Sequence, residues 1–197
     1  MIEFKPVNTP MAATQPPTTV GGAPFSDPMQ YCSVVGALQY VTLTRPNVAF
    51  AVNRVCQYMH SPTSDQWIMV KRIPRYLKAT ANHGFLITKN SALTLQAFTN
   101  SDWARNSTDS KSIGGYAIYL GSNLISWTSR KQKIVARSST ESEYKALVDA
   151  VAELIGLESL LKKIGCSLYT IPILWCDNIG ATYLSANPVF HARIKHL

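Results

Sequence analysis

The sequence predicts a mixed α/β fold with the element order βββαβα, preceded by a small helical segment. Before residue 80, apolar residues recur at helical spacing, and from residue 93 they give way to short runs rich in β-branched and aromatic residues. A long amphipathic stretch follows these runs, and after it come one further strand-like run and a short helix. Strands followed by a helix and another strand are typical of an α+β or mixed α/β sheet.

Residues 1–27 are predicted to be a proline-rich linker or an extended arm. They contain five prolines and the pair Gly21-Gly22. Proline lacks a backbone N–H and glycine adds conformational freedom, so neither a helix nor a central strand is expected there.

Residues 28–80 are predicted to be helical. Pro28 and Pro46 each suit the first turn of a helix, where the missing N–H would be unpaired in any case, and apolar residues follow at helical spacing. A third helix is expected over about residues 65–78. This helix contains Pro74, and because a mid-helix proline costs about 3 kcal/mol, we expect a kink or a break there.

Residues 93–197 form a second predicted region, which a connector over residues 81–92 joins to the first. Its first part contains short strand-like runs separated by Gly, Ser and Asn, and such a succession predicts an antiparallel meander. The expected strands are residues 93–99, 115–120, 124–127 and 133–136.

The second part of this region begins with a long amphipathic helix from about Thr140 to Ile164, for which Gly165 is the stop signal. Residues 171–176 are predicted to form a buried type of strand, and residues 179–186 a short helix. These three elements complete the order βββαβα.

The charge of the chain predicts a polyanionic partner. Its 197 residues include 19 Lys and Arg against 11 Asp and Glu, a formal net charge of +8. Nucleic acid is the commonest polyanion that such a surface attracts, and an acidic membrane surface is the next. Residues 28–80 are more basic per residue than the rest, and their cations form either a solvated helical face or a phosphate-contacting surface. The candidate contacts are Arg45, Arg54, Lys71, Arg72, Arg75 and Lys78, with Arg130 and Lys131 in the second region.

Cysteine usage and hydropathy predict an intracellular protein, cytoplasmic or nuclear, without a membrane partner. The cysteines show no C-x-x-C pair, so neither a zinc ribbon nor a disulfide-linked partner is expected. Residues 1–6 carry charges and a proline where a signal peptide needs an apolar run. The most apolar stretch, residues 34–43, is far shorter than the roughly 20 residues of a transmembrane helix. The four cysteines are Cys32, Cys56, Cys166 and Cys176.

Three acidic residues occupy positions that suit a metal site. Asp102 follows the first predicted strand, Glu143 lies in the first turn of the long helix, and Asp177 follows the strand at 171–176. Acids at strand ends and at a facing helix N-terminus can converge on one point. Such convergence is what two divalent cations about 3.5–4 Å apart require.

Each of these ligand assignments has a structural alternative. Glu143 lies on the apolar face of its helix and is the better ligand, whereas Glu141 precedes Lys145 by four residues and suits an exposed ion pair. Alternatively, Glu143 forms a capping box with Thr140. Asp177 can likewise serve as the N-cap of the following helix.

Several longer strings identify a family. The chain resembles, over residues 5–197, the Pol polyprotein of plant copia-type (Ty1/copia) LTR retrotransposons. The strings that carry the resemblance are Thr-Arg-Pro-Asn-Val-Ala-Phe-Ala-Val-Asn, Lys-Arg-Ile-Pro-Arg-Tyr-Leu-Lys, Ser-Asp-Trp-Ala, Ile-Ser-Trp-Thr-Ser-Arg-Lys-Gln, Ser-Ser-Thr-Glu-Ser-Glu-Tyr and Cys-Asp-Asn-Ile-Gly-Ala.

The resemblance implies that residues 28–80 are a remnant of the C-terminal region of a reverse transcriptase, past its catalytic aspartates. It implies that residues 93–197 are an RNase H-like domain whose last strand and helix are truncated. In this family the RNase H domain is a hydrolase that cleaves the RNA strand of RNA/DNA hybrids, with carboxylates that hold two Mg²⁺ ions. RNA/DNA hybrid is therefore the expected partner.

The family's catalytic positions carry over unevenly. Glu143 and Asp177 match a helix glutamate and a strand aspartate, and both are expected to ligate metal. Asn100 stands where the family has its first-strand aspartate, although Asp102 on the same side of that strand is a possible substitute. The fourth acid of the family follows a string that matches residues 195–197, the last of this sequence.

With two of these acids missing, we expect a metal site that is incomplete and an RNase H that is inactive or very weak. Two alternatives remain open at this stage. One is a nucleic-acid-binding module without catalysis, and the other is a decayed transposon fragment without a selected function.

Overall fold

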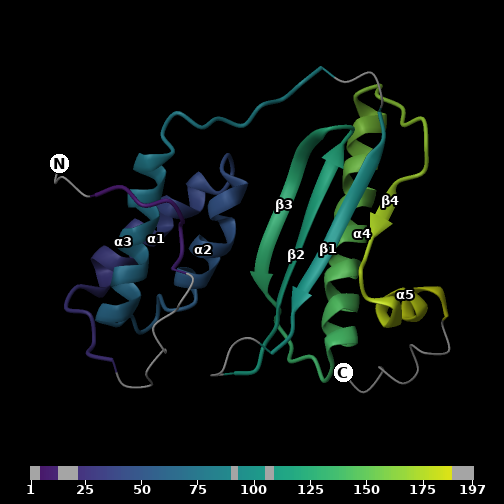
Figure 1. Ribbon diagram of the computed structural model, residues 1–197. Helices are drawn as coiled ribbons and strands as arrows, with labels where there is room; N and C mark the ends of the chain where they lie inside the picture. Colours follow the sequence, from purple (N-terminus) through teal and green to yellow (C-terminus); the bar gives the residue numbers. More distant parts are fainter. Residues whose placement is uncertain (1–4, 13–21, 90–92, 105–108, 188–197) are drawn as a thin grey trace. The chain divides into compact units, whose positions relative to one another are not determined.

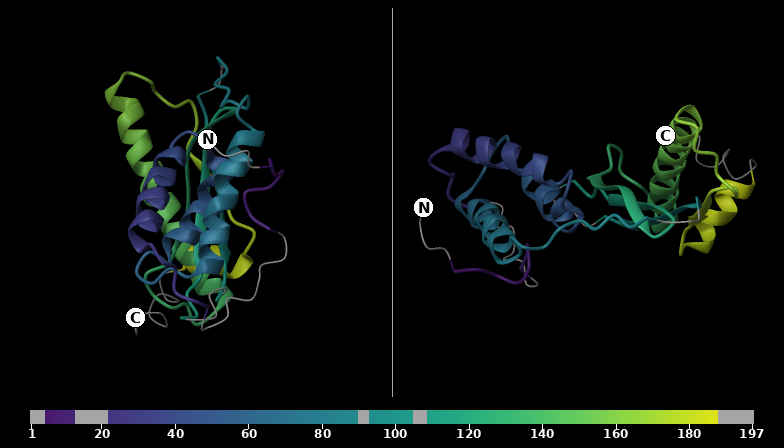
Figure 2. Two further views of the ribbon diagram at one scale, coloured as in Figure 1. Left: turned by 90° about the vertical axis from the view of Figure 1, so that its left-hand side faces the viewer. Right: turned by 90° about the horizontal axis from the view of Figure 1, so that it is seen from above.

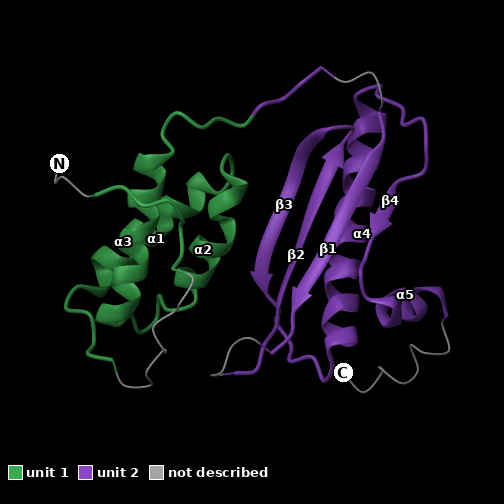
Figure 3. Ribbon diagram, in the orientation of Figure 1, with its two compact units in different colours: residues 1–85 green, residues 86–197 purple. Residues whose placement is uncertain are grey.

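The computed structural model of the protein describes residues 5–12, 22–89, 93–104 and 109–187. The chain divides into two compact units, residues 1–85 and residues 86–197 (Figure 3). The division falls within the connector predicted at residues 81–92. Among the described helices, none combines the length and the apolar character that crossing a membrane requires.

The first unit contains three helices, α1 (Pro28–Val41), α2 (Pro46–Cys56) and α3 (Ser64–Ala79) (Figure 1). Proline occupies the first turn of both α1 and α2, as predicted. The third helix begins with a capping box, in which the Thr63 N–H donates to Gln66 Oε1 at 2.8 Å. These signals fix where each helix begins.

The break predicted at Pro74 is absent, because α3 continues through this residue to Ala79. Proline still leaves one carbonyl of the preceding turn without its helical donor. However, Val70 and Ile73 are buried in the core of this unit, and their packing holds the helix together across the proline. The core cluster consists of Tyr31, Val35, Leu38, Val48, Ala51, Val52, Val55, Val70 and Ile73.

The second unit is built on a four-stranded sheet of order β3-β2-β1-β4. Three antiparallel strands, β1 (Leu95–Asp102), β2 (Ile113–Leu120) and β3 (Asn123–Lys131), form the predicted meander. A short strand, β4 (Ile173–Trp175), pairs in parallel with β1. The predicted mixed α/β class is therefore confirmed, and the arrangement is compatible with an RNase H-like fold.

Two helices accompany this sheet, α4 (Ser139–Lys163) and α5 (Ile179–Ala186). The long helix α4 runs along one face of the sheet, and α5 packs against α4 (Figures 1 and 2). Side chains alternate along β1, so that Ala97 and Thr99 are buried while Phe98 and Asn100 are exposed. The core cluster consists of Leu95, Ala97, Ile118, Leu154 and Leu161.

Two strand predictions are corrected. Residues 133–136 form no strand, because β3 ends at Lys131 opposite Ile113, the first residue of β2, and leaves them no partner in that ladder. The strand predicted at residues 171–176 is shorter and is not buried, since Ile173 is 46% exposed. This exposure follows from the position of β4 at the edge of the sheet.

Candidate functional site

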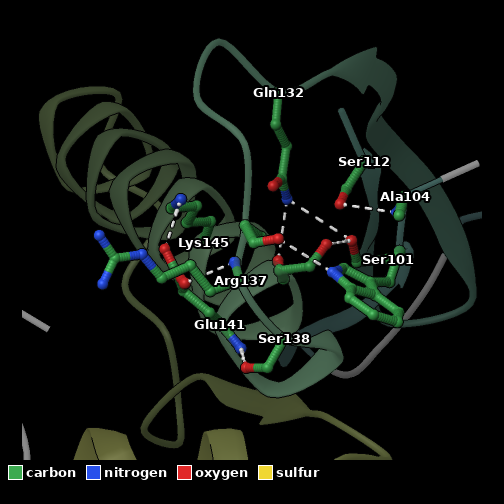
Figure 4. Close-up of polar contacts among 11 residues, drawn as sticks. Ser101, Ala104, Ser112, Gln132, Arg137, Ser138, Glu141 and Lys145 are labelled. Atoms are coloured by element: carbon green, nitrogen blue, oxygen red, sulfur yellow. Dashed lines mark hydrogen bonds and ion pairs between the residues drawn. The ribbon is translucent and has the colours of Figure 1, made fainter. Parts of the chain in front are cut away.

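The N-terminus of α4 is capped by residues other than the two predicted ones. Ser138 is the N-cap, and its side chain accepts a hydrogen bond from the Glu141 N–H. Glu141 Oε2 in turn accepts from the Arg137 N–H at 2.9 Å (Figure 4). Because Glu141 closes this cap, the alternative capping box of Thr140 with Glu143 is wrong.

The predicted ion pair of Glu141 with Lys145 is confirmed, at 2.8 Å, but it is not exposed: Glu141 is 7% exposed. Burial alone would raise the pKa of Glu141. The hydrogen bond from Lys145, the Arg137 N–H and the charges of both residues outweigh it, so that the pKa lies below its ordinary value. Glu141 is therefore a structural carboxylate.

Glu143 has a different environment. It is 6% exposed, and its Oε1 accepts a hydrogen bond from the Ser101 N–H at 2.8 Å. Its Oε2 is buried and has no hydrogen-bond partner. Burial raises the pKa of Glu143, the Ser101 hydrogen bond opposes this effect, and the negative charge of Asp177 adds to it. The fold thus holds a carboxylate oxygen that nothing in the described residues satisfies.

A polar network fixes the end of β1 against the start of α4 (Figure 4). The Ser101 hydroxyl lies within hydrogen-bond distance of the Ser142 hydroxyl, and Gln132 Nε2 donates to the Ser142 carbonyl at 2.8 Å. At the next turn of the chain, the Ala104 N–H donates to Ser112 Oγ at 3.2 Å. Because Ser101 and Ser142 both neighbour the Glu143 contact, this network sets the position of that carboxylate.

The acid after β4 is available to a ligand. Asn178 is the N-cap of α5, and its Oδ1 accepts from the Ala181 N–H at 2.9 Å. The alternative that Asp177 caps α5 is therefore wrong. Asp177 is exposed, and it approaches the unsatisfied carboxylate of Glu143 from the edge of the sheet.

Cys176 completes a group that sequence reasoning missed. One ligand atom each of Glu143, Cys176 and Asp177 lies within 4.8 Å of the other two. The string Cys-Asp after a strand was the available signal, but a lone cysteine without a C-x-x-C partner does not predict a ligand. Asp102 does not belong to this group.

Asn100 lies within β1, where it pairs with Gly115 of β2, two residues before the end of the strand. The parallel register of β1 with β4 ends at Phe98 and Trp175, and Asn100 and Asp177 each lie two residues beyond that pair. Thr99 Oγ1, between them, donates to the Trp175 carbonyl at 3.3 Å. A neutral amide thus stands where the resemblance implies a carboxylate. The position of the fourth acid, next to residues 195–197, lies outside the described residues.

The gathered side chains do not fit a pair of Mg²⁺ ions. Mg²⁺ demands near-octahedral coordination by oxygen, and two such ions need several carboxylates to offset their charge. Glu143 and Asp177 supply two carboxylates and Cys176 a thiol, while Asn100 contributes no charge. No step of a reaction can be assigned to Mg²⁺ with this set.

Three arginines of the first unit that were predicted to contact phosphate form hydrogen bonds within that unit. Arg72 Nε donates to the Thr9 carbonyl at 3.1 Å, and Arg75 Nε donates to the Lys5 carbonyl at 2.8 Å. These contacts hold residues 5–12 against α3. Arg45 likewise bonds the carbonyls of Thr80 and His83. Lys71 and Lys78 are exposed, whereas Arg54 is half-buried.

In the second unit, Lys131 forms an ion pair with Asp109 at 2.6 Å. Its neighbour Arg130 is exposed. A cavity between β2, β3 and α4 is lined by both residues together with Lys133 and Lys145. Four cationic side chains therefore line this cavity together with Asp149, and two of them, Lys131 and Lys145, are paired with acids.

Comparison with known proteins identifies relatives over the whole chain. It is 48% identical to a retrovirus-related Pol polyprotein from transposon RE2 of Arabidopsis thaliana, of which it covers 14%. It is 47% identical to the corresponding polyprotein from transposon RE1 of the same plant, covering 13%. A third relative, the Pol polyprotein from transposon TNT 1-94 of Nicotiana tabacum, is 36% identical, and the chain covers 15% of it.

The chain spans about one-seventh of the length of these relatives. No protein-family model and no solved structure matches it. The full-length identity to several plant transposon polyproteins nevertheless agrees with the resemblance carried by the motifs. The chain is a homologue of the Pol polyproteins of copia-type plant retrotransposons, and it corresponds to a transposon-derived region of such a polyprotein.

Proposed function

We propose that residues 93–197 are an RNase H-like domain that binds RNA/DNA hybrids and cleaves them weakly or not at all. Residues 28–80 are, in this proposal, the C-terminal remnant of the preceding reverse transcriptase. The observation that carries the proposal is the convergence of Glu143 and Asp177, with Glu143 held by the N–H of Ser101, the residue after Asn100 in β1.

The weakness of catalysis follows from the residue at position 100. An asparagine side chain offers one neutral carbonyl oxygen as an acceptor, whereas an aspartate offers two oxygens and a negative charge. Hydrolysis of a phosphodiester at a metal cluster depends on several charged ligands acting as a unit, so the loss of one costs far more than its share. The carboxylates that remain, Glu143 and Asp177, hold the site's geometry without completing its charge.

Binding without cleavage is the second candidate, and the exposed cations favour it. Arg130 lies in the cavity beside β2 and β3, where it can contact a backbone phosphate. Contacts of this kind give an affinity that falls steeply with salt and is insensitive to base sequence. Lys71 and Lys78 offer similar contacts on the first unit.

The proposal is tested with purified chain and a labelled RNA/DNA hybrid, measured for binding over a salt series and for cleavage in Mg²⁺ or Mn²⁺. We expect salt-dependent binding, a preference for hybrid over double-stranded DNA, and no cleavage above that of a Glu143→Gln control. Efficient cleavage that the control lacks would refute the claim of impairment. Absence of binding to any nucleic acid would refute the function itself and favour a decayed fragment.

A further inference from the structure

We propose that Glu143, Cys176 and Asp177 form a binding site for one borderline-soft divalent cation, of which Zn²⁺ is the representative, in place of a pair of Mg²⁺ ions. The ligand atoms of these residues already lie within 4.8 Å of one another. Atoms bound to one tetrahedral Zn²⁺ lie about 2.0–2.3 Å from it, so its ligand atoms are roughly 3.3–3.8 Å apart. Binding therefore requires the three side chains to approach one another by no more than about 1.5 Å.

The buried oxygen of Glu143 is an independent sign that a ligand belongs here. Glu143 is 6% exposed, and its Oε2 has no hydrogen-bond partner within the part of the chain that the structure describes. A buried carboxylate oxygen without a partner carries the full cost of its desolvation. A cation between this oxygen and Asp177 would remove that cost and would also neutralise the repulsion between the two carboxylates.

The chemistry of the donors selects the cation. Thiolate sulfur is a soft ligand that favours Zn²⁺ and is foreign to Mg²⁺, which takes oxygen ligands. Two carboxylates and one thiolate supply three protein ligands to a tetrahedral ion, and the fourth position is left to water. The three negative charges offset the charge of one dication and fall short of the four positive charges of two.

Two of the three proposed ligands, Glu143 and Cys176, form hydrogen bonds with neighbouring backbone groups. The Ser101 N–H holds the Glu143 carboxylate through Oε1, and Oε2 keeps its acceptor capacity for a cation. Cys176 Sγ lies 3.8 Å from the Asn178 carbonyl, to which its S–H donates in the metal-free state. On binding, the thiol proton passes to solvent and the sulfur binds the cation as thiolate, so one proton is released for each ion bound at this ligand.

This inference rests on the proposed function, in which Glu143 and Asp177 belong to one site. It adds Cys176 as a ligand and Zn²⁺ as the metal, neither of which the resemblance implies. A site with one Zn²⁺ links Glu143 of α4 to the segment that follows β4. It does not supply the two-ion arrangement of phosphodiester hydrolysis.

The experiment is a titration of the full chain with Zn²⁺, followed by calorimetry, and with Co²⁺, followed by absorption. Co²⁺ bound by a thiolate gives a near-ultraviolet sulfur-to-metal charge-transfer band, which carboxylates alone do not give. We expect one tight Zn²⁺ site per chain, the Co²⁺ band, and binding of Mg²⁺ that is far weaker. Cys176→Ala should abolish the band, and Glu143→Gln should weaken Zn²⁺ more than about tenfold.

Cys166→Ala is the matched control, because Cys166 is a half-buried thiol of the same unit outside the group. It should leave both signals unchanged. Equal Zn²⁺ affinity of the Cys176→Ala variant and the unmodified chain, or loss of the band in the Cys166→Ala control, would overturn the proposal. Hybrid binding measured in chelator separates the two ideas. If the chain binds RNA/DNA hybrid but has no metal site that depends on Cys176, this inference alone is refuted. If it has that metal site but binds no hybrid, the proposed function alone is refuted.

Discussion

Replacing Glu143 by glutamine should stabilise the metal-free protein, although the residue is buried and hydrogen-bonded. Glutamine keeps the shape of the side chain and the acceptor for the Ser101 N–H. It removes a charge whose second oxygen is unsatisfied and which Asp177 repels. The new amide N–H₂ can in addition donate to the Asp177 carboxylate.

The magnitude follows from the separation of the two carboxylates. At 4.8 Å, two unit charges repel by about 3.5 kcal/mol at an effective dielectric constant of about 20, and by about 1 kcal/mol in water. Because Asp177 is exposed, the smaller figure is the better guide, and we expect a gain of about 1–2 kcal/mol. For a domain of this size, each kcal/mol of that gain raises the melting temperature by roughly 4–8 °C.

Glu141→Gln is the matched control, because Glu141 lies two residues before Glu143 on α4 and is equally buried. Its carboxylate is paired with Lys145 and accepts from the Arg137 N–H, so glutamine should destabilise the domain by about 1–3 kcal/mol. Thermal and urea unfolding of both variants in chelator measures the two effects. The reasoning is refuted if Glu143→Gln lowers the unfolding midpoint as Glu141→Gln does, since Glu143 would then be a structural carboxylate.

Three further predictions concern other parts of the chain. An added Cβ on Gly115 would lie 2.8 Å from a backbone carbonyl oxygen of β3, so Gly115→Ala should lower the free energy of unfolding in urea by about 1–3 kcal/mol. Gly156 in α4 has nothing within 4 Å of its added Cβ, so Gly156→Ala should raise that free energy by about 0.5–1 kcal/mol. Equal effects of the two substitutions would contradict this reasoning. Burial raises the pKa of Tyr31 above its ordinary 10.0, so the unfolded state loses this proton at a lower pH than the folded state. The free energy of unfolding should therefore fall above pH 10.0 by up to about 1.4 kcal/mol per pH unit. Tyr31→Phe should reduce this slope in urea titrations at several pH values. Arg72→Ala should release residues 5–12 and speed their cleavage in limited proteolysis, while Lys71→Ala, on the exposed side of α3, should not.

Most elements were predictable because their signals are local. Proline in the first turn marks α1 and α2, and the apolar spacing within each run separates helix from strand. Where tertiary packing decides, the prediction was wrong. Burial of Val70 and Ile73 carries α3 through Pro74, and residues 133–136 lack a strand partner although their composition suits a strand. Neither effect can be read from a single segment.

The candidate site was predictable in part for a related reason. Helical phase correctly predicted the ion pair of Glu141 with Lys145, but it did not predict that Glu141 is as buried as Glu143. The caps were misassigned by one or two residues, since Ser138 and Asn178 compete with equally suitable neighbours and only the backbone geometry decides between them. Cys176 was missed because one of its two partners, Glu143, comes from α4, which is distant in the sequence.

The cleavage activity of an Asn100→Asp variant tests the central claim most directly. If Asn100 is what leaves the Glu143 and Asp177 cluster short of charge, this single change should raise metal-dependent cleavage of RNA/DNA hybrid above that of the unmodified chain. The gain should disappear when Glu143→Gln is added to the same variant. Equal cleavage by the unmodified chain and the Asn100→Asp variant, at a rate that depends on Glu143, would contradict the account.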